Sequence, residues 1–259
     1  MIQIIAHGNV RELRLHRPPV NALSPELVVA LRKAIETAPA EGVRGLVLSG
    51  APGRFSGGLD VPLLLGLDQT ATAEFWKNFY WLLGVIAGST IPVACAITGH
   101  APAGGIVLGL FCDWRVMASG DYKVGLNEVQ VGIPLPPVIL SALQRQVGFR
   151  RAEWLAVTGA LLAPAAALEA GLVDELAHPD RVVQAAIAHC QCRVALPPEA
   201  MGLTRRQARA DLTALFEVDL EQELRTVMES WWSSETQTAL GALVERLGKK
   251  GGYPSPSGD

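Results

Sequence analysis

The sequence has few aromatic and few charged residues for its length. Aromatic side chains make up 6% and charged side chains 18% of the 259 residues, and the formal net charge is only −3. The chain therefore lacks the basic stripe, interleaved with aromatic residues, that nucleic-acid-binding proteins carry, and we expect no nucleic-acid partner. Hydrophobic residues make up 49% of the chain, so an aliphatic core can form without disulfides or a structural metal.

Cysteine is also scarce, with four residues in the chain. Cys95 and Cys112 stand in apolar runs, and the tract His189, Cys190 and Cys192 lacks a second ligand pair at zinc spacing. We therefore expect core cysteines and no metal. The chain has no apolar run long enough to cross a bilayer and opens on a strand-like run rather than a secretory leader. These features predict a soluble protein with no membrane partner, in the cytoplasm or, for a processed eukaryotic chain, in the mitochondrial matrix.

Short β-like runs alternate with helical segments through the first half of the chain, which is typical of βαβ crossovers and a mainly parallel sheet. The strand-like runs are residues 2–6, 10–16, 44–49, 91–98, 114–118 and 122–125. Ser24 followed by Pro25 predicts a helix start, and residues 71–88 have helical spacing.

After about Pro136 the pattern becomes helical, at residues 141–147, 151–158, 165–170, 181–194 and 219–247. We expect three parts: an α/β core at 1–195, a helical C-terminal region at 196–250 and a flexible tail at 251–259.

Two glycine-rich loops follow buried strands, at residues 56–60 (SGGLD) and 102–105 (PAGG). In open α/β sheets, ligands bind beyond the carboxyl ends of the strands, and glycine lets backbone approach a ligand closely. Two such loops on neighbouring strands can aim two backbone N–H groups at one oxygen, which forms an oxyanion hole. The spacing alone also fits ordinary tight turns packed against a helix.

Four segments carry a specific resemblance in their order and spacing: 42–60 (GVRGLVLSGAPGRFSGGLD), 91–113 (IPVACAITGHAPAGGIVLGLFCD), 122–134 (YKVGLNEVQVGIP) and 158–173 (TGALLAPAAALEAGLV). Over roughly residues 1–250 the chain resembles the crotonase (enoyl-CoA hydratase/isomerase) superfamily. The resemblance implies an α/β fold of the crotonase (ClpP-like) type, with repeated ββα units around a parallel sheet and a helical C-terminal trimerisation region. It also implies an acyl-CoA thioester substrate, no cofactor, and a homotrimer or a dimer of trimers.

The same resemblance assigns roles to individual residues. The backbone N–H groups of Leu59 and Gly104 would bind the thioester oxygen, and the CoA moiety would lie along residues 21–23 and the first glycine-rich loop. The residues implied in binding are Ala22, Gly58, Leu59, Asp60, Gly104, Gly105 and Asn127.

The nature of the reaction depends on Val107 and Glu128. Superfamily hydratases carry glutamates at both corresponding positions, and Val107 cannot transfer a proton. Moving a double bond needs a single base, whereas adding water benefits from two groups. Segments 100–105 (HAPAGG) and 125–130 (GLNEVQ) also resemble the mitochondrial-type 3,2-trans-enoyl-CoA isomerases. The sequence therefore predicts an enoyl-CoA isomerase of fatty acid β-oxidation, with Glu128 as its one catalytic acid/base residue.

Several side chains have two interpretations each. Asn127 orients Glu128 or closes a turn, Asp60 stabilises its loop or contacts the ligand, and we expect His100 to shape the second loop rather than act as a base. Trp76, Phe79 and Trp81 line an acyl tunnel or belong to the core. Trp231 and Trp232 form core or subunit contacts. Lys249 and Lys250 bind CoA phosphates or are solvated.

Other activities of the same fold are alternatives. A hydratase could act with Glu128 alone, though poorly. A hydrolase or dehalogenase would need a carboxylate nucleophile near the thioester, and the sequence identifies none. A non-catalytic acyl-CoA-binding protein is a further alternative, against which Glu128 and the two intact glycine-rich loops argue. The first strand is not followed by G-x-G-x-x-G, which argues against a dinucleotide-dependent dehydrogenase.

Overall fold

A six-stranded sheet runs through the centre of the molecule, in a computed structural model that describes residues 1–217 and 220–249. Its order is β1-β2-β3-β5-β7-β9, and only β1 and β2 pair antiparallel. The mainly parallel sheet predicted from the alternation of strands and helices is thus confirmed. The strands are β1 (Ile2–His7), β2 (Val10–Leu15), β3 (Gly45–Ser49), β5 (Val93–Ile97), β7 (Trp114–Ala118) and β9 (Glu175–Ala177).

A repeated ββα unit builds the core. Strands β3, β5 and β7 are each followed by a short strand of a second, three-stranded parallel sheet, formed by β4 (Gly53–Arg54), β6 (Gly99–Pro102) and β8 (Val124–Gly125). A helical segment then closes each unit, and the crotonase-type fold is confirmed. These segments are α2 (Val61–Leu64) with α3 (Gln69–Gly88), α4 (Gly104–Leu110), and the 3₁₀ turn η1 (Glu128–Val131) with α5 (Pro137–Val147).

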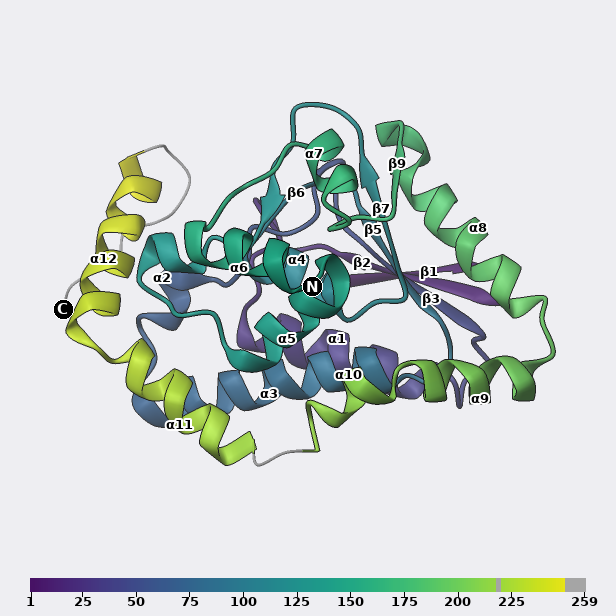
Figure 1. Cartoon of the computed structure of the whole chain (residues 1–259), viewed down its shortest axis with the longest axis horizontal. Coiled ribbons are helices and arrows are strands. Elements are labelled where there is room, and N and C mark those ends of the chain that lie inside the picture. The colour runs from purple at the N-terminus through teal and green to yellow at the C-terminus, as the bar shows by residue number, and fades with distance from the viewer. Residues whose placement is uncertain (218–219, 250–259) are drawn as a thin grey trace.

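Helices cover both faces of the large sheet (Figure 1). On one face α8 (Val182–Val194) packs on β3, β5 and β7. On the other face lie α1 (Pro25–Thr37), α3 and α4, with the larger hydrophobic cluster between them and the sheet. Every residue of β3 and β5 is buried, as expected for strands covered on both sides.

Side-chain caps set two of these helix starts. Ser24 Oγ accepts a hydrogen bond of 3.3 Å from Leu27 N, and Pro25 occupies the first turn, so the predicted start of α1 is confirmed. Asp68 caps α3 by accepting from Ala71 N at 2.8 Å, which starts that helix at Gln69 rather than at the predicted residue 71.

The C-terminal region is helical, but the bounds of its individual helices differ from those predicted. The single helix expected at 219–247 is wrong, because the chain turns at Ser233, whose Oγ accepts from Thr236 N at 3.2 Å and begins a new helix. The edge strand β9 gave no signal in the sequence, because its three half-buried residues form no apolar run. The remaining elements are α6 (Phe149–Thr158), α7 (Pro164–Glu169), η2 (Pro179–Arg181), α9 (Pro198–Ala208), α10 (Ala210–Ala214), α11 (Leu220–Trp231) and α12 (Ser234–Lys249).

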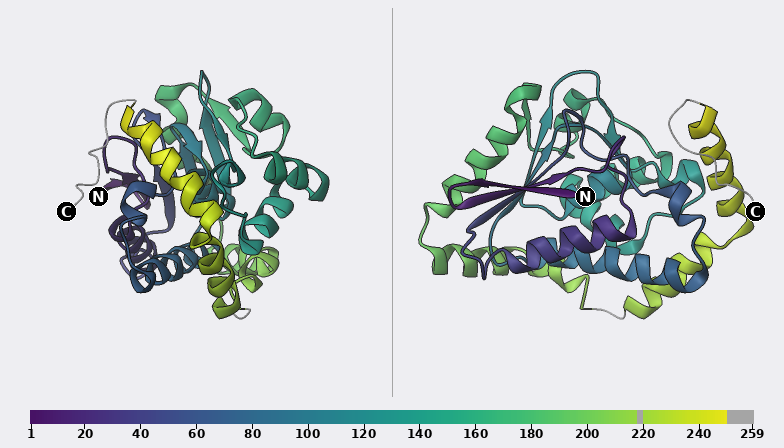
Figure 2. Two further views of the ribbon diagram at one scale, coloured as in Figure 1. Left: turned by 90° about the vertical axis from the view of Figure 1, so that its left-hand side faces the viewer. Right: turned by 180° about the vertical axis from the view of Figure 1, so that it is seen from behind.

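Helices α11 and α12 lie at the end of the molecule opposite α8 and α9 (Figures 1 and 2). They fold onto the core, because Val227, Trp231 and Leu240 are buried in the main hydrophobic cluster. Across residues 1–217 and 220–249, no helix combines the length and apolar character that a bilayer crossing needs. Lys250 and the tail predicted at 251–259 lie outside the described residues.

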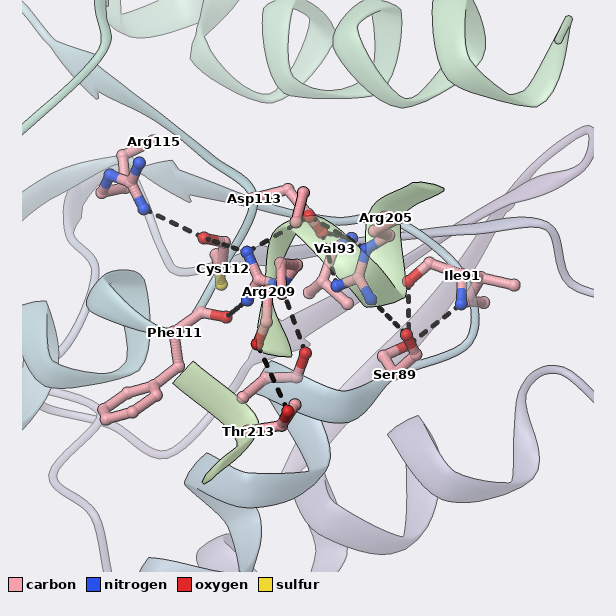
Figure 3. Close-up of polar contacts among 12 residues, drawn as sticks. Ser89, Ile91, Val93, Phe111, Cys112, Asp113, Arg115, Arg205, Arg209 and Thr213 are labelled. Carbon is pink, nitrogen blue, oxygen red and sulfur yellow. Dashed lines mark hydrogen bonds and ion pairs between the residues drawn. The ribbon is translucent and has the colours of Figure 1, made fainter. Parts of the chain in front are cut away.

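A buried ionic network attaches α9 and the turn after it to the end of α4 (Figure 3). Asp113 accepts two hydrogen bonds of 2.9 Å from Arg205 and one of 2.7 Å from Val93 N, and lies 3.3 Å from the Arg209 guanidinium. Arg209 also donates to the carbonyl of Phe111, directly after α4. Burial raises the pKa of Asp113, but the charges of Arg205 and Arg209 outweigh it and leave this pKa below its usual range.

Replacing Asp113 by Asn should lower the free energy of unfolding by about 3 kcal/mol at pH 7, because two buried guanidiniums lose their counter-charge. Because the pKa of Asp113 is lowered in the folded state, the difference should shrink as the pH falls below about 4. Urea denaturation measures it. Glu153→Gln is the matched control, since Glu153 pairs with Arg150 at 3.6 Å on the surface and should change stability by less than about 0.5 kcal/mol. A loss in Asp113→Asn no larger than the control would contradict the assignment.

Candidate active site

The first glycine-rich loop is held by the segment that precedes α1. Leu23 N donates to Gly58 O at 2.8 Å, and Asp60 N donates to Leu23 O at 3.2 Å, in a parallel bridge between Leu23 and Leu59. This bridge uses the groups on either side of Leu59 and leaves the Leu59 N–H pointing away from Leu23. The structure thus brings residues 21–23 beside the loop, as the resemblance implied.

The second loop packs directly against the first. A Cβ added at Gly104 would lie 3.4 Å from Leu59 N, and one at Gly105 would lie only 2.9 Å from Ser56 O. Ala103 has a φ of 46°, which is rare for a residue with a side chain, and its N–H donates to Gly125 O at 2.8 Å. This geometry is backbone strain held by its surroundings, and it sets the direction of the next N–H, that of Gly104.

The N–H groups of Leu59 and Gly104 are available to a ligand. Within the described residues neither donates a hydrogen bond, and both residues line the same cavity. Two unpartnered backbone donors on adjoining loops are the arrangement that stabilises an oxyanion.

Glu128 opens the turn η1, directly after Asn127. The turn is fixed from one side by Gln130, whose Nε2 donates to Gly159 O at 2.9 Å. Gly132 closes it in the left-handed conformation, with a φ of 74°.

The loops and the turn surround a cavity of about 340 Å³. Among its lining residues that the structure describes, only Glu128 is ionisable, and Val107, 1% exposed, forms part of the apolar wall. The other lining residues are Val20, Ala22, Gly57, Leu59, Val61, Pro62, Trp76, Phe79, Pro102, Ala103, Gly104, Asn127, Val131, Ile133, Pro136, Ile139, Leu243 and Leu247.

The carboxyl of Glu128 lies in an environment that favours its neutral form. The residue is half-buried as a whole, but its Oε2 is fully buried and has no hydrogen-bond partner among the described residues. Burial raises the pKa of Glu128 to about 7, and a hydrogen bond from its own backbone N–H opposes that rise. Near neutral pH such a group can both accept and return a proton.

The predicted binding residues fall into two sets. Ala22, Leu59, Gly104 and Asn127 line the cavity, whereas Gly58, Asp60 and Gly105 lie behind it. Asp60 is 1% exposed, pairs with Arg17 and accepts from Leu63 N at 3.3 Å, so its carboxylate stabilises the loop and begins α2. The Oδ1 of Asn127 is buried without a partner among the described residues. Contact of these residues with CoA stays a prediction.

The three aromatic residues considered for an acyl tunnel also fall into two groups, those that line the cavity and one that does not. Trp76 and Phe79 are buried and also line the cavity, so both interpretations hold for them. Trp81 does not line it; this side chain is 50% exposed and lies 3.9 Å from the Arg32 guanidinium. Trp231 belongs to the core, where its ring packs edge-on against Trp76 at 6.0 Å.

Two histidines for which the sequence predicts structural roles make structural contacts. His100 Nδ1 accepts from Lys123 N at 3.1 Å, and its ring packs edge-on against Tyr122, so His100 shapes the loop as expected. His189 stacks on Trp114 at 4.6 Å, and burial lowers the pKa of this histidine to about 4. Cys190 is buried between α8 and the sheet.

The contribution of α12 to the cavity was missed from the sequence. Leu243 and Leu247, one helical turn apart, form part of the cavity wall. Their spacing predicts an apolar helix face, but no local signal identifies the surface it covers.

Comparisons with known proteins agree with this geometry. The family model for enoyl-CoA hydratase/isomerase matches residues 6–250. The chain is 32% identical over 97% of its length to mouse "Enoyl-CoA delta isomerase 1, mitochondrial", covering 88% of that protein. It is 30% identical over 91% of its length to a "Putative enoyl-CoA hydratase" of Thermus thermophilus, covering 93% of it.

A solved structure is similar throughout. The crystal structure of human mitochondrial delta3-delta2-enoyl-CoA isomerase superposes with a TM-score of 0.92 at 29% identity, covering 97% of this chain and 99% of that one. The relatives agree on the family, while their names divide between isomerase and hydratase.

The raised pKa of Glu128 has a consequence for stability. Because the unfolded chain releases this proton at a lower pH than the folded one, the carboxyl should destabilise the fold increasingly between about pH 4.5 and pH 7. Glu128→Gln should therefore be more stable than the wild type by up to roughly 3 kcal/mol at pH 8, with little difference at pH 4.5. Denaturant titrations at the two pH values measure this, with exposed Glu153→Gln as the control. Equal gains at both pH values would show that the carboxyl is not held in its neutral form.

Proposed function

We propose that this chain, which belongs to the enoyl-CoA hydratase/isomerase family and is an enzyme of that family, is an isomerase. In the proposed reaction it moves the double bond of a 3-enoyl-CoA to the 2-position. The observation that supports this proposal is that Glu128 is the single ionisable residue among the described residues that line the cavity. Glu128 lines the same cavity as the free N–H groups of Leu59 and Gly104. One acid/base residue beside two oxyanion donors is sufficient for moving a double bond.

In the proposed reaction, Glu128 removes a proton from C2 of the 3-enoyl-CoA. The electrons of that C–H bond form the C1–C2 double bond of a dienolate, and the negative charge moves to the thioester oxygen. The N–H groups of Leu59 and Gly104 donate hydrogen bonds to this oxygen, and each donor contributes about 3 kcal/mol. The protonated Glu128 then delivers the proton to C4, which leaves the double bond between C2 and C3.

The composition of the cavity favours isomerisation over the other reactions of the family. Hydration benefits from a second polar group that holds the water, and at the corresponding position stands buried Val107. A hydrolase or dehalogenase would need a carboxylate nucleophile, and no second carboxylate is among the described lining residues. The Thermus relative named as a putative hydratase keeps hydration as the second candidate activity.

Substrate, assembly and location follow from the same proposal. An acyl-CoA of fatty acid β-oxidation is the expected substrate, in accord with the mouse and human relatives. We propose a homotrimer or a dimer of trimers, supported by the exposed apolar side chains of Phe149, Trp154 and Val157 on α6 and tested by sedimentation mass. Four free cysteines suit a reducing compartment, the cytoplasm or the mitochondrial matrix.

A paired assay tests the reaction. Purified wild type should convert trans-3-hexenoyl-CoA to the 2-enoyl form much faster than it hydrates crotonyl-CoA. Glu128→Gln should lower kcat for isomerisation at least ~100-fold, because general acid–base catalysis contributes that much. Hydration faster than isomerisation would favour the hydratase, and full activity in Glu128→Gln would exclude the proposed base.

The oxyanion donor at Gly104 can be tested by a matched pair of variants. Gly104→Ala and Gly104→Pro both add a side chain near Leu23 and Leu59, but only Pro removes the N–H. Gly104 is the first residue of α4, where proline is tolerated. We expect kcat of the Pro variant to fall ~100-fold below that of the Ala variant. Equal kcat values in the two folded variants would remove Gly104 N–H from the mechanism.

A further inference from the structure

The N-terminus of α12 contacts the turn that carries Glu128. The Oγ1 of Thr236 donates a short hydrogen bond to Gly132 O, across 104 residues of sequence. Thr236 is 1% exposed and receives a hydrogen bond of 3.1 Å from Ser233 Oγ. Ser233, Thr236 and the Gly132 carbonyl therefore form one chain of hydrogen bonds between the helix cap and the turn.

Gly132 is the residue that closes η1. Its N–H donates back to the carbonyls of Glu128 and Val129, and Ile133 N donates to Glu128 O at 3.1 Å. The helix also packs directly on its backbone, since a Cβ at Gly132 would lie 3.2 Å from Thr236 Cα and from Ala239 Cβ. The position of α12 is thus transmitted to the backbone of Glu128 through the end of a single short turn.

Apart from the backbone of η1 and packing, few contacts fix the direction of the Glu128 side chain. Its Oε2 has no hydrogen-bond partner within the described residues, so its aim into the cavity depends on the backbone of η1 and on packing. A base that must reach both C2 and C4 tolerates little displacement, since an error of about 1 Å can cost ~100-fold in rate. The hydroxyl that anchors η1 is therefore placed to affect the chemical step.

We propose that Thr236 is a positioning residue for Glu128, which holds the catalytic turn from α12 through the Gly132 carbonyl. This inference rests on the proposed function, because it takes Glu128 to be the base. The same helix supplies Leu243 and Leu247 to the cavity wall. One element thus contacts the site of the acyl group and anchors the base that acts on it.

Three variants of α12 test the proposal in the full-length protein. Thr236→Val keeps the volume and loses the donor, Thr236→Ser keeps the donor, and Thr238→Val is the matched control. Thr238 is exposed and donates to Ser234 O at 2.7 Å within the same helix. With trans-3-hexenoyl-CoA, Thr236→Val should lower kcat roughly tenfold with KM changed less than threefold. Thr236→Ser should stay within threefold of the wild type, and Thr238→Val should match it.

The pH profile separates positioning from mere stabilisation. Thr236→Val should also displace the pH of half-maximal kcat/KM, because the surroundings of the Glu128 carboxyl change, while Thr238→Val should not. An unchanged kcat and pH profile in folded Thr236→Val, even with a lowered melting temperature, would overturn the proposal. If Thr236→Val does not fold, Thr236→Cys, with a weaker donor, carries the test, and its kcat should lie below that of Thr236→Ser.

Failure of this inference is distinguishable from failure of the proposed function. If the wild type isomerises and Glu128→Gln does not, while Thr236→Val behaves as the wild type, only the positioning role is lost. If the wild type fails to isomerise, or Glu128→Gln retains full activity, the proposed function falls and the role of Thr236 falls with it.

Discussion

The site depends on the close approach of two backbone loops at Gly104 and Gly105. A Cβ at Gly105 would lie 2.9 Å from the Ser56 carbonyl, so this contact between the loops requires glycine, whereas a Cβ at Gly104 would meet the side chains of Leu23 and Leu59 at 3.2 and 3.3 Å. That contact brings the N–H groups of Leu59 and Gly104 to one cavity, where neither donates to an acceptor of the described residues. The ββα repeat serves this contact, because parallel strands β3 and β5 deliver both loops to the same edge of the sheet.

The second constraint is that no positively charged side chain is among the described residues that line the cavity with Glu128. An ion pair would lower the pKa of the carboxyl and make it a poor proton carrier at neutral pH, whereas the apolar wall raises that pKa to about 7. Asp113 shows the opposite case in the same fold, because Arg205 and Arg209 hold its pKa low and its role is structural. The two buried carboxyls differ in their neighbours, and that difference suits Glu128 to the proposed acid/base role and Asp113 to a structural one.

Features encoded by short segments could be predicted from the sequence, and long-range contacts could not. The sequence predicts the two glycine-rich loops, the cap at Ser24 and the position of Glu128, because each depends on residues within a few positions. The break at Ser233 has a local signal, the cap in which Ser233 Oγ accepts from Thr236 N, and the prediction of one continuous helix overlooked it. The packing of Leu243 and Leu247 on the cavity, by contrast, depends on lining residues more than a hundred positions away. Trp81 is a different case, because it lies five residues from Trp76 and two from Phe79 rather than three or four, so helical spacing already places it on another face of α3, where it is exposed.

The cavity combines fixed backbone donors with a side chain that keeps some freedom of movement, and this difference has a physical basis. The proposed oxyanion donors are backbone groups of packed loops, which cannot rotate away, while the proposed proton carrier is a side chain on a one-turn element. A group that must transfer a proton between two carbons benefits from limited freedom, whereas donors that stabilise charge work best when fixed beforehand. Anchoring η1 at its far end, through Gly132, restrains the backbone of Glu128 and leaves its Oε2 without a hydrogen-bond partner among the described residues. The hydrogen bond from Thr236 to Gly132 therefore fixes the backbone of η1 without restricting the Oε2 atom of Glu128, and a site with a single base needs both.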